Sequence, residues 1–137
     1  MRKFHKMKVF KSIQEIENAL IAEKQANKTI GFVPTMGALH NGHISLIEKA
    51  KQENDIVVVS IFVNPLQFNV KADYDKYPRN LDSDVEILSQ YNTDYIFAPS
   101  YDEIYQDYKI KTFNLNHLND ILEGEHRPGH FNGVANV

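Results

Sequence analysis

Thr29-Ile-Gly-Phe-Val-Pro-Thr-Met-Gly-Ala-Leu-His-Asn-Gly-His43 is the stretch of sequence that decides the fold. It begins as a short apolar strand, which Pro34 is expected to end, and continues into a turn that contains two glycines. A segment of helical composition follows over 44–52, with its apolar residues on one side. The order of strand, turn and helix predicts one unit of a parallel α/β sheet, with the turn at the carboxyl end of the strand.

The segments on either side extend this pattern. Ser12 followed by Glu15 forms a capping-box pattern, and the apolar spacing after it predicts a helix that ends near Asn27. Residues 56–63 are apolar at successive positions rather than at alternate ones. Such a run is typical of a strand buried between two layers of helices, and it indicates a parallel sheet.

The C-terminal half supplies the remaining elements. Asp82 is predicted to cap a helix that runs to about Tyr91, and residues 95–98 form the next strand. From residue 108 to 115 the alternation changes phase, which suits a bulged or edge strand. We therefore predict an α/β fold, a doubly wound parallel sheet of the Rossmann-like kind, in one domain over residues 1–137.

Composition limits the classes of function. The 137 residues are 42% hydrophobic and 24% charged, which is ordinary for a globular domain and argues against disorder. The net charge of −3 provides no broad basic field for nucleic acid. No cysteine is present, which excludes disulfides and thiolate zinc sites, and no apolar run reaches the roughly 18 residues that span a bilayer. We expect a cytoplasmic protein that binds neither nucleic acid nor membrane.

The turn has the chemistry of an anion site. Gly37 and Gly42 would let phosphates approach the backbone, and the amides at the start of the following helix are expected to point outward. His40 and His43 can project to the same side and donate to phosphate oxygens. Their spacing also occurs in metal sites, but no third ligand is evident, so no metal is predicted. From spacing alone, a purely structural turn stays an equal alternative.

Other polar residues carry weaker signals. Gln67 follows the end of a buried strand and could offer its amide to a hydroxy acid, although a plain loop residue is an equal reading. Arg79 and Arg127 could clamp a carboxylate or phosphate, but an ordinary surface ion pair is favoured for Arg79. A group of aspartates is expected to mark solvated loops and helix starts; it comprises Asp73, Asp75, Asp82 and Asp84.

Four blocks of the sequence resemble a known family. The His40-Asn-Gly-His43 segment is similar to the signature of the nucleotidylyltransferase superfamily. Together with the blocks 62–68, 77–79 and 122–131, the longer stretch 34–43 resembles the pantothenate synthetases, also called pantoate–β-alanine ligases. These blocks occur in the family's order over nearly the whole chain.

The resemblance implies an AMP-forming ligase that acts in two steps. ATP and pantoate, assisted by Mg²⁺, would give a pantoyl adenylate, and β-alanine would then displace AMP to give pantothenate.

His43 would be the catalytic proton donor, with His40 assisting at the phosphates. The implied ATP-binding residues are Pro34, Thr35, Met36, Gly37, Ala38, Leu39, His40, Asn41, Gly42 and His43. The implied substrate-binding residues are Gln67 and Asn64, with Tyr77, Glu123 and Arg127 around the second substrate. Family members pair through this domain, which implies a homodimer.

The chain also departs from the family. Members continue through a Lys-Asp and glutamine motif and a C-terminal domain with a Ser-Arg motif, and they usually have threonine in place of Asn136. We therefore expect the chain to be an N-terminal nucleotide-binding domain that is incomplete on its C-terminal side. Two alternatives stay open: a dimerising or weakly ligand-binding fragment without activity of its own, and another nucleotidylyltransferase with the same histidine signature.

Overall fold

The computed structural model describes residues 6–115 and 129–137. Within these residues the centre is a four-stranded parallel sheet in the order β1-β4-β3-β2. Its strands are β1 (Lys8–Phe10), β2 (Ile30–Thr35), β3 (Ile56–Ile61) and β4 (Tyr95–Phe97). The helical elements are α1 (Ile13–Gln25), α2 (Asn41–Glu53), the 3-10 turn η1 (Pro65–Gln67), α3 (Lys71–Lys76), α4 (Leu81–Ser89), α5 (Tyr101–Tyr105) and α7 (His130–Asn136).

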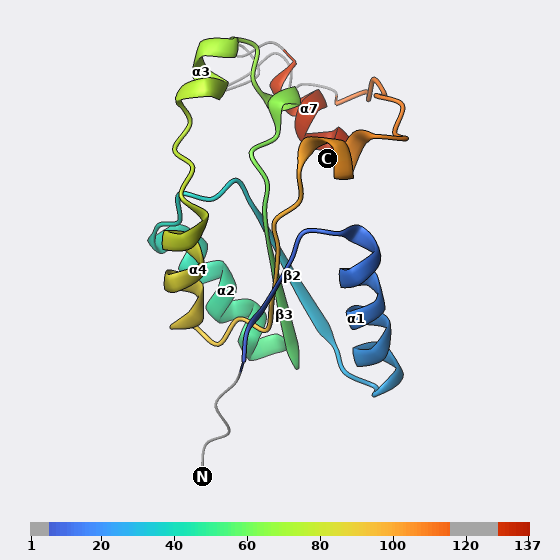
Figure 1. Ribbon diagram of the computed structural model, residues 1–137, viewed down its shortest axis with the longest axis vertical. Helices are drawn as coiled ribbons and strands as arrows, with labels where there is room; N and C mark the ends of the chain where they lie inside the picture. Colours follow the sequence, from blue (N-terminus) through green and yellow to red (C-terminus); the bar gives the residue numbers. More distant parts are fainter. Residues whose placement is uncertain (1–5, 116–128) are drawn as a thin grey trace.

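Helices cover both faces of the sheet: α1 lies on one face, and α2 and α4 lie on the other (Figure 1). The chain crosses from β1 at one edge to β2 at the other through α1. It then returns one strand at a time through α2 and α4 to β3 and β4. Because crossovers between parallel strands are right-handed, these opposite directions of travel place the helices on opposite faces. The predicted doubly wound α/β fold is confirmed.

The β3 strand lies inside the sheet and is buried on both faces, as its apolar run predicts. Val57 packs with Ile47 of α2 and Leu88 of α4 on one side. Val58 packs with Ile16 of α1 on the other side. The two clusters hold the sheet between its layers of helices, so that the carboxyl ends of the strands have fixed positions.

Three details of the elements differ from the sequence prediction. The strand β1 was not predicted, because three residues with mostly exposed side chains carry no buried pattern. Strand β2 does not end at Pro34 but continues to Thr35, and this is possible because β2 is an edge strand, where a proline need not donate to a neighbour. Helix α4 is capped by Asn80, whose Oδ1 accepts from the Ser83 amide, and not by Asp82.

The predicted strand over 108–115 is wrong. Side chains of α7 satisfy the backbone of this segment in place of a neighbouring strand. The Asn136 amide bonds to both the N–H and the C=O of Lys111, each at 2.8 Å. The Asn132 Oδ1 accepts from the Phe113 amide at 2.8 Å. A segment with a strand-like alternation therefore lies against a helix and not at a sheet edge.

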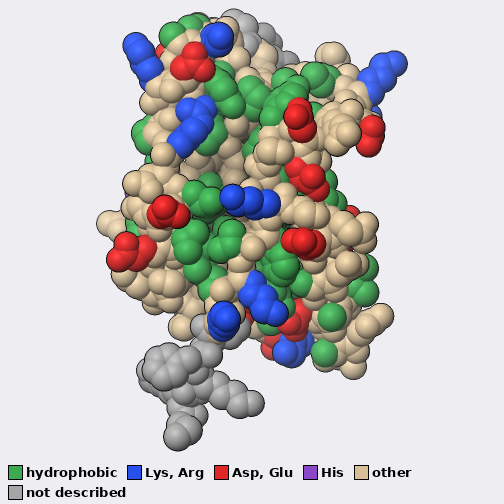
Figure 2. Space-filling model, viewed as in Figure 1, with side chains coloured by type: hydrophobic (Ala, Val, Ile, Leu, Met, Phe, Trp, Pro, Cys, Tyr) green, Lys and Arg blue, Asp and Glu red, His purple; other side chains and the backbone are tan. Residues whose placement is uncertain are grey.

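Charges of both signs are distributed over the surface. Lysine and arginine alternate with aspartate and glutamate on the face shown in Figure 2, and neither sign gathers into a single patch there. Within residues 6–115 and 129–137, no helix has the length and apolar character needed to cross a bilayer.

Candidate functional site

A cavity of about 490 Å³ opens at the carboxyl ends of the parallel strands. Thr35 lines it at the end of β2, Met36 just after β2, Phe62 after β3 and Pro99 after β4. Its wall also contains Pro34, His43, Gln67 and Tyr77. The structure therefore brings together, around one cavity, residues from three of the four blocks that the sequence analysis selected.

Backbone and side-chain bonds hold the turn between β2 and α2 in one conformation. Gly37 and Ala38 have positive φ angles of 76° and 51°. The Thr35 hydroxyl accepts from the Gly37 amide at 3.1 Å and donates to the Ser60 carbonyl at 2.9 Å. The Asp84 carboxylate of α4 accepts from the next two amides of the turn, each at 3.2 Å. Thr35 and Asp84 together hold the turn in place.

For residues 37–40 and 42, the bonds correct the prediction of outward-pointing amides. The amides of Gly37, Ala38 and Leu39 donate to Thr35 and Asp84. Two further amides, those of His40 and Gly42, donate to histidine rings. Because the chain already uses these N–H groups, a ligand at this turn would meet side-chain donors in their place.

His40 and His43 cap helix α2 reciprocally. His40 is the N-cap residue, and its Nδ1 accepts from the Gly42 amide at 3.1 Å, while Nδ1 of His43 accepts from the His40 amide at 3.2 Å. The rings lie side by side, with centroids 4.0 Å apart. Since each Nδ1 accepts a hydrogen bond, each ring in its neutral form carries its proton on Nε2. The pair thus presents two Nε2–H donors, and the predicted common orientation is confirmed.

The environment keeps His43 neutral. Partial burial lowers its pKa below 6.5, and the neighbouring His40 lowers it further, whereas the Asp84 carboxylate acts in the opposite direction. Protonation at Nδ1 would also remove the acceptor for the His40 amide and place a positive charge at the positive end of α2. The neutral ring of His43 can therefore donate a hydrogen bond from its own N–H group, and it does not need the positive charge of the doubly protonated form.

This predicts a pH dependence of stability. The unfolded chain takes up a proton at His43 near pH 6.5, whereas the folded chain does so only at lower pH. The free energy of unfolding should therefore fall as the pH drops through 6.5 towards the lower folded-state pKa, and level off below it. Urea unfolding measured across this range should show a shallower decline for His43→Gln, because glutamine can accept the same amide bond without titrating. Identical slopes in both proteins would contradict this account.

Asn64 holds Gln67 at the cavity wall. Asn64 is fully buried, and its Nδ2 donates to Gln67 Oε1 and to the Gly133 carbonyl, both at 3.0 Å. Its Oδ1 accepts from the Leu66 amide and from the Tyr105 hydroxyl. Burial raises the pKa of Tyr105 to about 12, so this hydroxyl stays a donor at neutral pH. The bonds of Asn64 are with Gln67, Gly133, Leu66 and Tyr105, and its direct contact with a substrate stays a prediction.

Tyr77 and Arg79 lie in the segment between α3 and α4. Tyr77 lines the cavity and packs edge-on against Phe68. Arg79 lies over the ring of Tyr74, with 4.4 Å between its Cζ and the ring centroid, and donates to the carbonyls of Tyr74 and Tyr77. Among the described residues it has no carboxylate partner, so the favoured surface ion pair is not found there. Glu123 and Arg127 lie outside the described residues.

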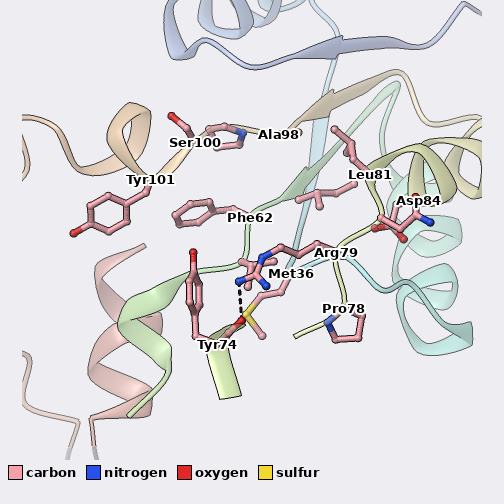
Figure 3. Close-up of a pocket in the computed structure, with 15 residues that line it drawn as sticks. Met36, Phe62, Tyr74, Pro78, Arg79, Leu81, Asp84, Ala98, Ser100 and Tyr101 are labelled. Carbon is pink, nitrogen blue, oxygen red and sulfur yellow. Dashed lines mark hydrogen bonds between the residues drawn. The ribbon is translucent and has the colours of Figure 1, made fainter. Parts of the chain in front are cut away.

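A second, smaller cavity of about 270 Å³ lies beside the first one and shares Met36, Phe62 and Pro99 with it. Figure 3 shows Asp84 on one side of this cavity and Tyr101 on the other, with Met36 and Arg79 between them. The two cavities are thus separated by a wall that includes a flexible methionine side chain.

Asp84 is the site residue that the sequence analysis missed. We predicted it to be solvated, but it is only 4% exposed. The sequence does contain a signal for its burial. Asp84 stands among Leu81, Val85 and Leu88, which form the apolar side of α4 at helical spacing. A carboxylate within such an apolar stripe needs buried hydrogen-bond donors, and the turn after β2 supplies them.

Fold and site together define an α/β domain with a ligand-sized cavity at the carboxyl ends of its parallel strands, where open sheets of this type bind their ligands. The sequence model of the family described as pantoate-beta-alanine ligase matches residues 8–137. The chain belongs to the pantoate–β-alanine ligase family.

Individual relatives agree with this assignment. A pantothenate synthetase of Azobacteroides pseudotrichonymphae is 52% identical over 132 residues, which are 96% of this chain and 47% of the relative. The crystal structure of the Thermus thermophilus protein matches with a TM-score of 0.84 and 43% identity, over 94% of this chain and 45% of that one. A Francisella tularensis ligase, solved with β,γ-ATP and β-alanine, has the same TM-score and 49% identity over 96% of this chain and 50% of that one. The chain spans about half the length of these relatives.

Proposed function

We propose that this chain is the N-terminal, Rossmann-like ATP- and pantoate-binding part of an enzyme that condenses pantoate with β-alanine to give pantothenate. The observation that carries the proposal is the cavity at the strand ends, where His43, Gln67 and Tyr77 meet the segment that follows β2. The Francisella relative, which was solved with β,γ-ATP and β-alanine, supports the same choice of substrates.

In the first step, a carboxylate oxygen of pantoate would attack the α-phosphorus of ATP. The new oxygen–phosphorus bond gives pantoyl adenylate, and the bond to the β-phosphate breaks to release pyrophosphate. Residues 34–43 would surround the phosphates, and the Nε2–H groups of His40 and His43 would donate to oxygens on which negative charge increases. In the second step, the β-alanine amine would form the amide bond, lose a proton and release AMP.

Gln67 would orient pantoate, and Tyr77, which lines the same cavity, would lie near the second substrate. The Gln67 side chain is 8% exposed, lines the cavity and is fixed through Asn64. Its amide can match the carboxylate and hydroxyl groups of a hydroxy acid. Glu123 and Arg127 stay predictions for the second substrate.

Mg²⁺ would enter with ATP. Among the described residues, no three His, Asp or Glu side chains are grouped to hold a metal ion. Mg²⁺ usually keeps several waters and binds substrate phosphates with one or two carboxylates, so the ATP phosphates would supply part of its ligands. Bound there, it would neutralise phosphate charge.

The deciding experiment is a substrate panel for the ligase that contains this chain together with the second half found in its relatives. AMP and pantothenate should form from ATP, pantoate and β-alanine, and nucleoside monophosphates should not replace pantoate. Activity with a nucleotide acceptor would favour another nucleotidylyltransferase.

The 137-residue chain tested alongside distinguishes a self-sufficient enzyme from a fragment without activity of its own. The same proteins, examined by sedimentation and by cell fractionation, test the proposed homodimer and cytoplasmic location.

Replacing Gln67 by alanine should weaken pantoate binding about 10- to 100-fold, because the substrate would lose a partner in a buried site. ATP binding should stay nearly unchanged. Calorimetric titration of each substrate measures both effects, and Gln90→Ala on the exposed C-terminal end of α4 is the matched control. An equal loss for ATP and pantoate would indicate misfolding and contradict the role.

A further inference from the structure

Asp84 joins helix α4 to the turn that follows β2. Its side chain is 4% exposed and lies at the border of the smaller cavity (Figure 3). Each of its two oxygens accepts one hydrogen bond: Oδ2 accepts from the Ala38 amide and Oδ1 from the Leu39 amide, each at 3.2 Å. The carboxylate thus bridges two successive N–H groups of a left-handed turn, a geometry that commonly binds anions.

The turn is shaped around this carboxylate. Gly37 has a φ angle of 76°, and a Cβ atom built on it would lie 2.8 Å from Asp84 Oδ2. Ala38 adopts a φ of 51°, a conformation that is unfavourable for a residue with a side chain and needs compensating contacts. The Asp84 bond to the Ala38 amide is such a contact.

Asp84 differs from the other acidic residues near the sheet. Asp94 is also buried, but it pairs with Lys51 at 3.1 Å. Asp82, on the same turn of α4, is exposed. The ion pairs of the described residues include none with Asp84, whose charge is met by backbone amides. An unpaired buried carboxylate is costly unless its position has such donors.

We propose that Asp84 is a positioning residue that acts as a built-in anion for the turn. Its carboxylate occupies the backbone donors of Ala38 and Leu39, which leaves the imidazole donors of His40 and His43 to meet the ligand. The idea that these imidazole donors serve catalysis rests on the proposed function. The effect of Asp84 on the conformation of the turn and on the pKa of His43 does not.

The effect that Asp84 should have on the pKa of His43 follows from the charged and titratable groups around the His43 ring. His40 lies beside it on the turn, Asp84 faces it from α4, and Tyr77 shares its cavity from the segment before α4. The Asp84 carboxylate favours the protonated form of His43 and so raises the pKa of that ring. Removing the Asp84 charge should therefore lower the pKa of His43 further.

Asp84→Asn tests the proposal, with Asp82→Asn as the matched control. The histidine titrations and the amide hydrogen exchange of each chain are followed by NMR. In Asp84→Asn, the exchange at Ala38 and Leu39 should accelerate about tenfold or more, because a charge-assisted acceptor is lost and the new NH₂ group faces one of the amides. The pKa of His43 should fall, while the amides of Val57 and Ile96 in the core keep their wild-type exchange. Asp82→Asn should change none of these quantities.

An unchanged His43 pKa together with unchanged exchange at Ala38 and Leu39 would overturn the proposal. If Asp84→Asn does not fold, the wild-type chain gives the answer: the Asp84 carboxyl carbon and the Ala38 and Leu39 amide shifts should titrate with one common midpoint, and independent midpoints would overturn the proposal. None of these measurements needs ATP or pantoate. A failure of the proposed function and a failure of this inference are therefore separate results.

Discussion

His43→Ala is expected to slow pantoyl adenylate formation by about 10²- to 10³-fold, because it removes a preorganised donor to charge that develops in the transition state. The ring of His43 is held by its own bond to the His40 amide and is kept neutral by partial burial. It therefore needs no reorganisation before it donates from Nε2. Pantoate binding should change little, since Gln67, the residue proposed to bind pantoate, forms a different part of the cavity wall.

Single-turnover release of pyrophosphate measures this step in the ligase that contains both halves. Two variants separate the ring donor from the helix cap. His43→Gln can keep the cap, because its side-chain oxygen can accept from the His40 amide, but it lacks the imidazole, so the reaction should stay slow. Ser45→Ala, on the exposed next turn of α2, should react at the wild-type rate. A near wild-type rate for His43→Ala would exclude the proposed role.

Gly133→Ala should have the second large effect, because α7 contacts η1 directly through this glycine. A Cβ atom there would lie 2.0 Å from the Leu66 carbonyl oxygen and 2.6 Å from the Gln67 amide nitrogen. Backbone cannot move aside as a flexible side chain does, so α7 must shift. The shift would break the bond from Asn64 to the Gly133 carbonyl and release the support of Gln67.

We expect Gly133→Ala to lower the free energy of unfolding by about 1–3 kcal/mol, the usual range for an overpacked site. Pantoate affinity should fall along with it. Urea unfolding and calorimetric titration measure the two effects, and Ala135→Ser, at an exposed position of the same helix, is the control. A variant with wild-type unfolding midpoint and wild-type pantoate affinity would show that α7 does not pack on η1 as described.

Regular elements inside the sheet could be predicted from the sequence because burial leaves a local pattern. The apolar run of β3 and the amphipathic spacing of α2 both reflect packing against two layers. The strand β1 left no such pattern, since it is three residues long with two exposed side chains. The segment around Lys111 was misassigned because its partners, Asn132 and Asn136, come from a helix.

The sequence predicted that two polar residues of the candidate site lie near the ends of strands, but it did not predict the bonds that hold them. The positions of His43 and Gln67 followed from the ends of two strands, and the structure places both at one cavity. The role of Asp84 could not be predicted, because its partners, Ala38 and Leu39, lie more than forty residues away in the sequence. A side chain that meets distant backbone amides gives no periodic signal. The capping role of the two histidine rings is local, but it could not be predicted because histidine is unusual at a helix start.

The contacts of α7 also divide the molecule into parts that can open separately. Asn132 and Asn136 tie the helix to residues 111–113, and Gly133 ties it to η1, whereas the two apolar clusters lie in the sheet and its covering helices. Native proteins open locally in cooperative units whose contacts are mostly internal. Helix α7 lies outside both apolar clusters and packs mainly on η1. Its opening would expose Gln67 while the sheet stays folded, so the pantoate side of the cavity would fluctuate at a lower free energy than the histidine turn.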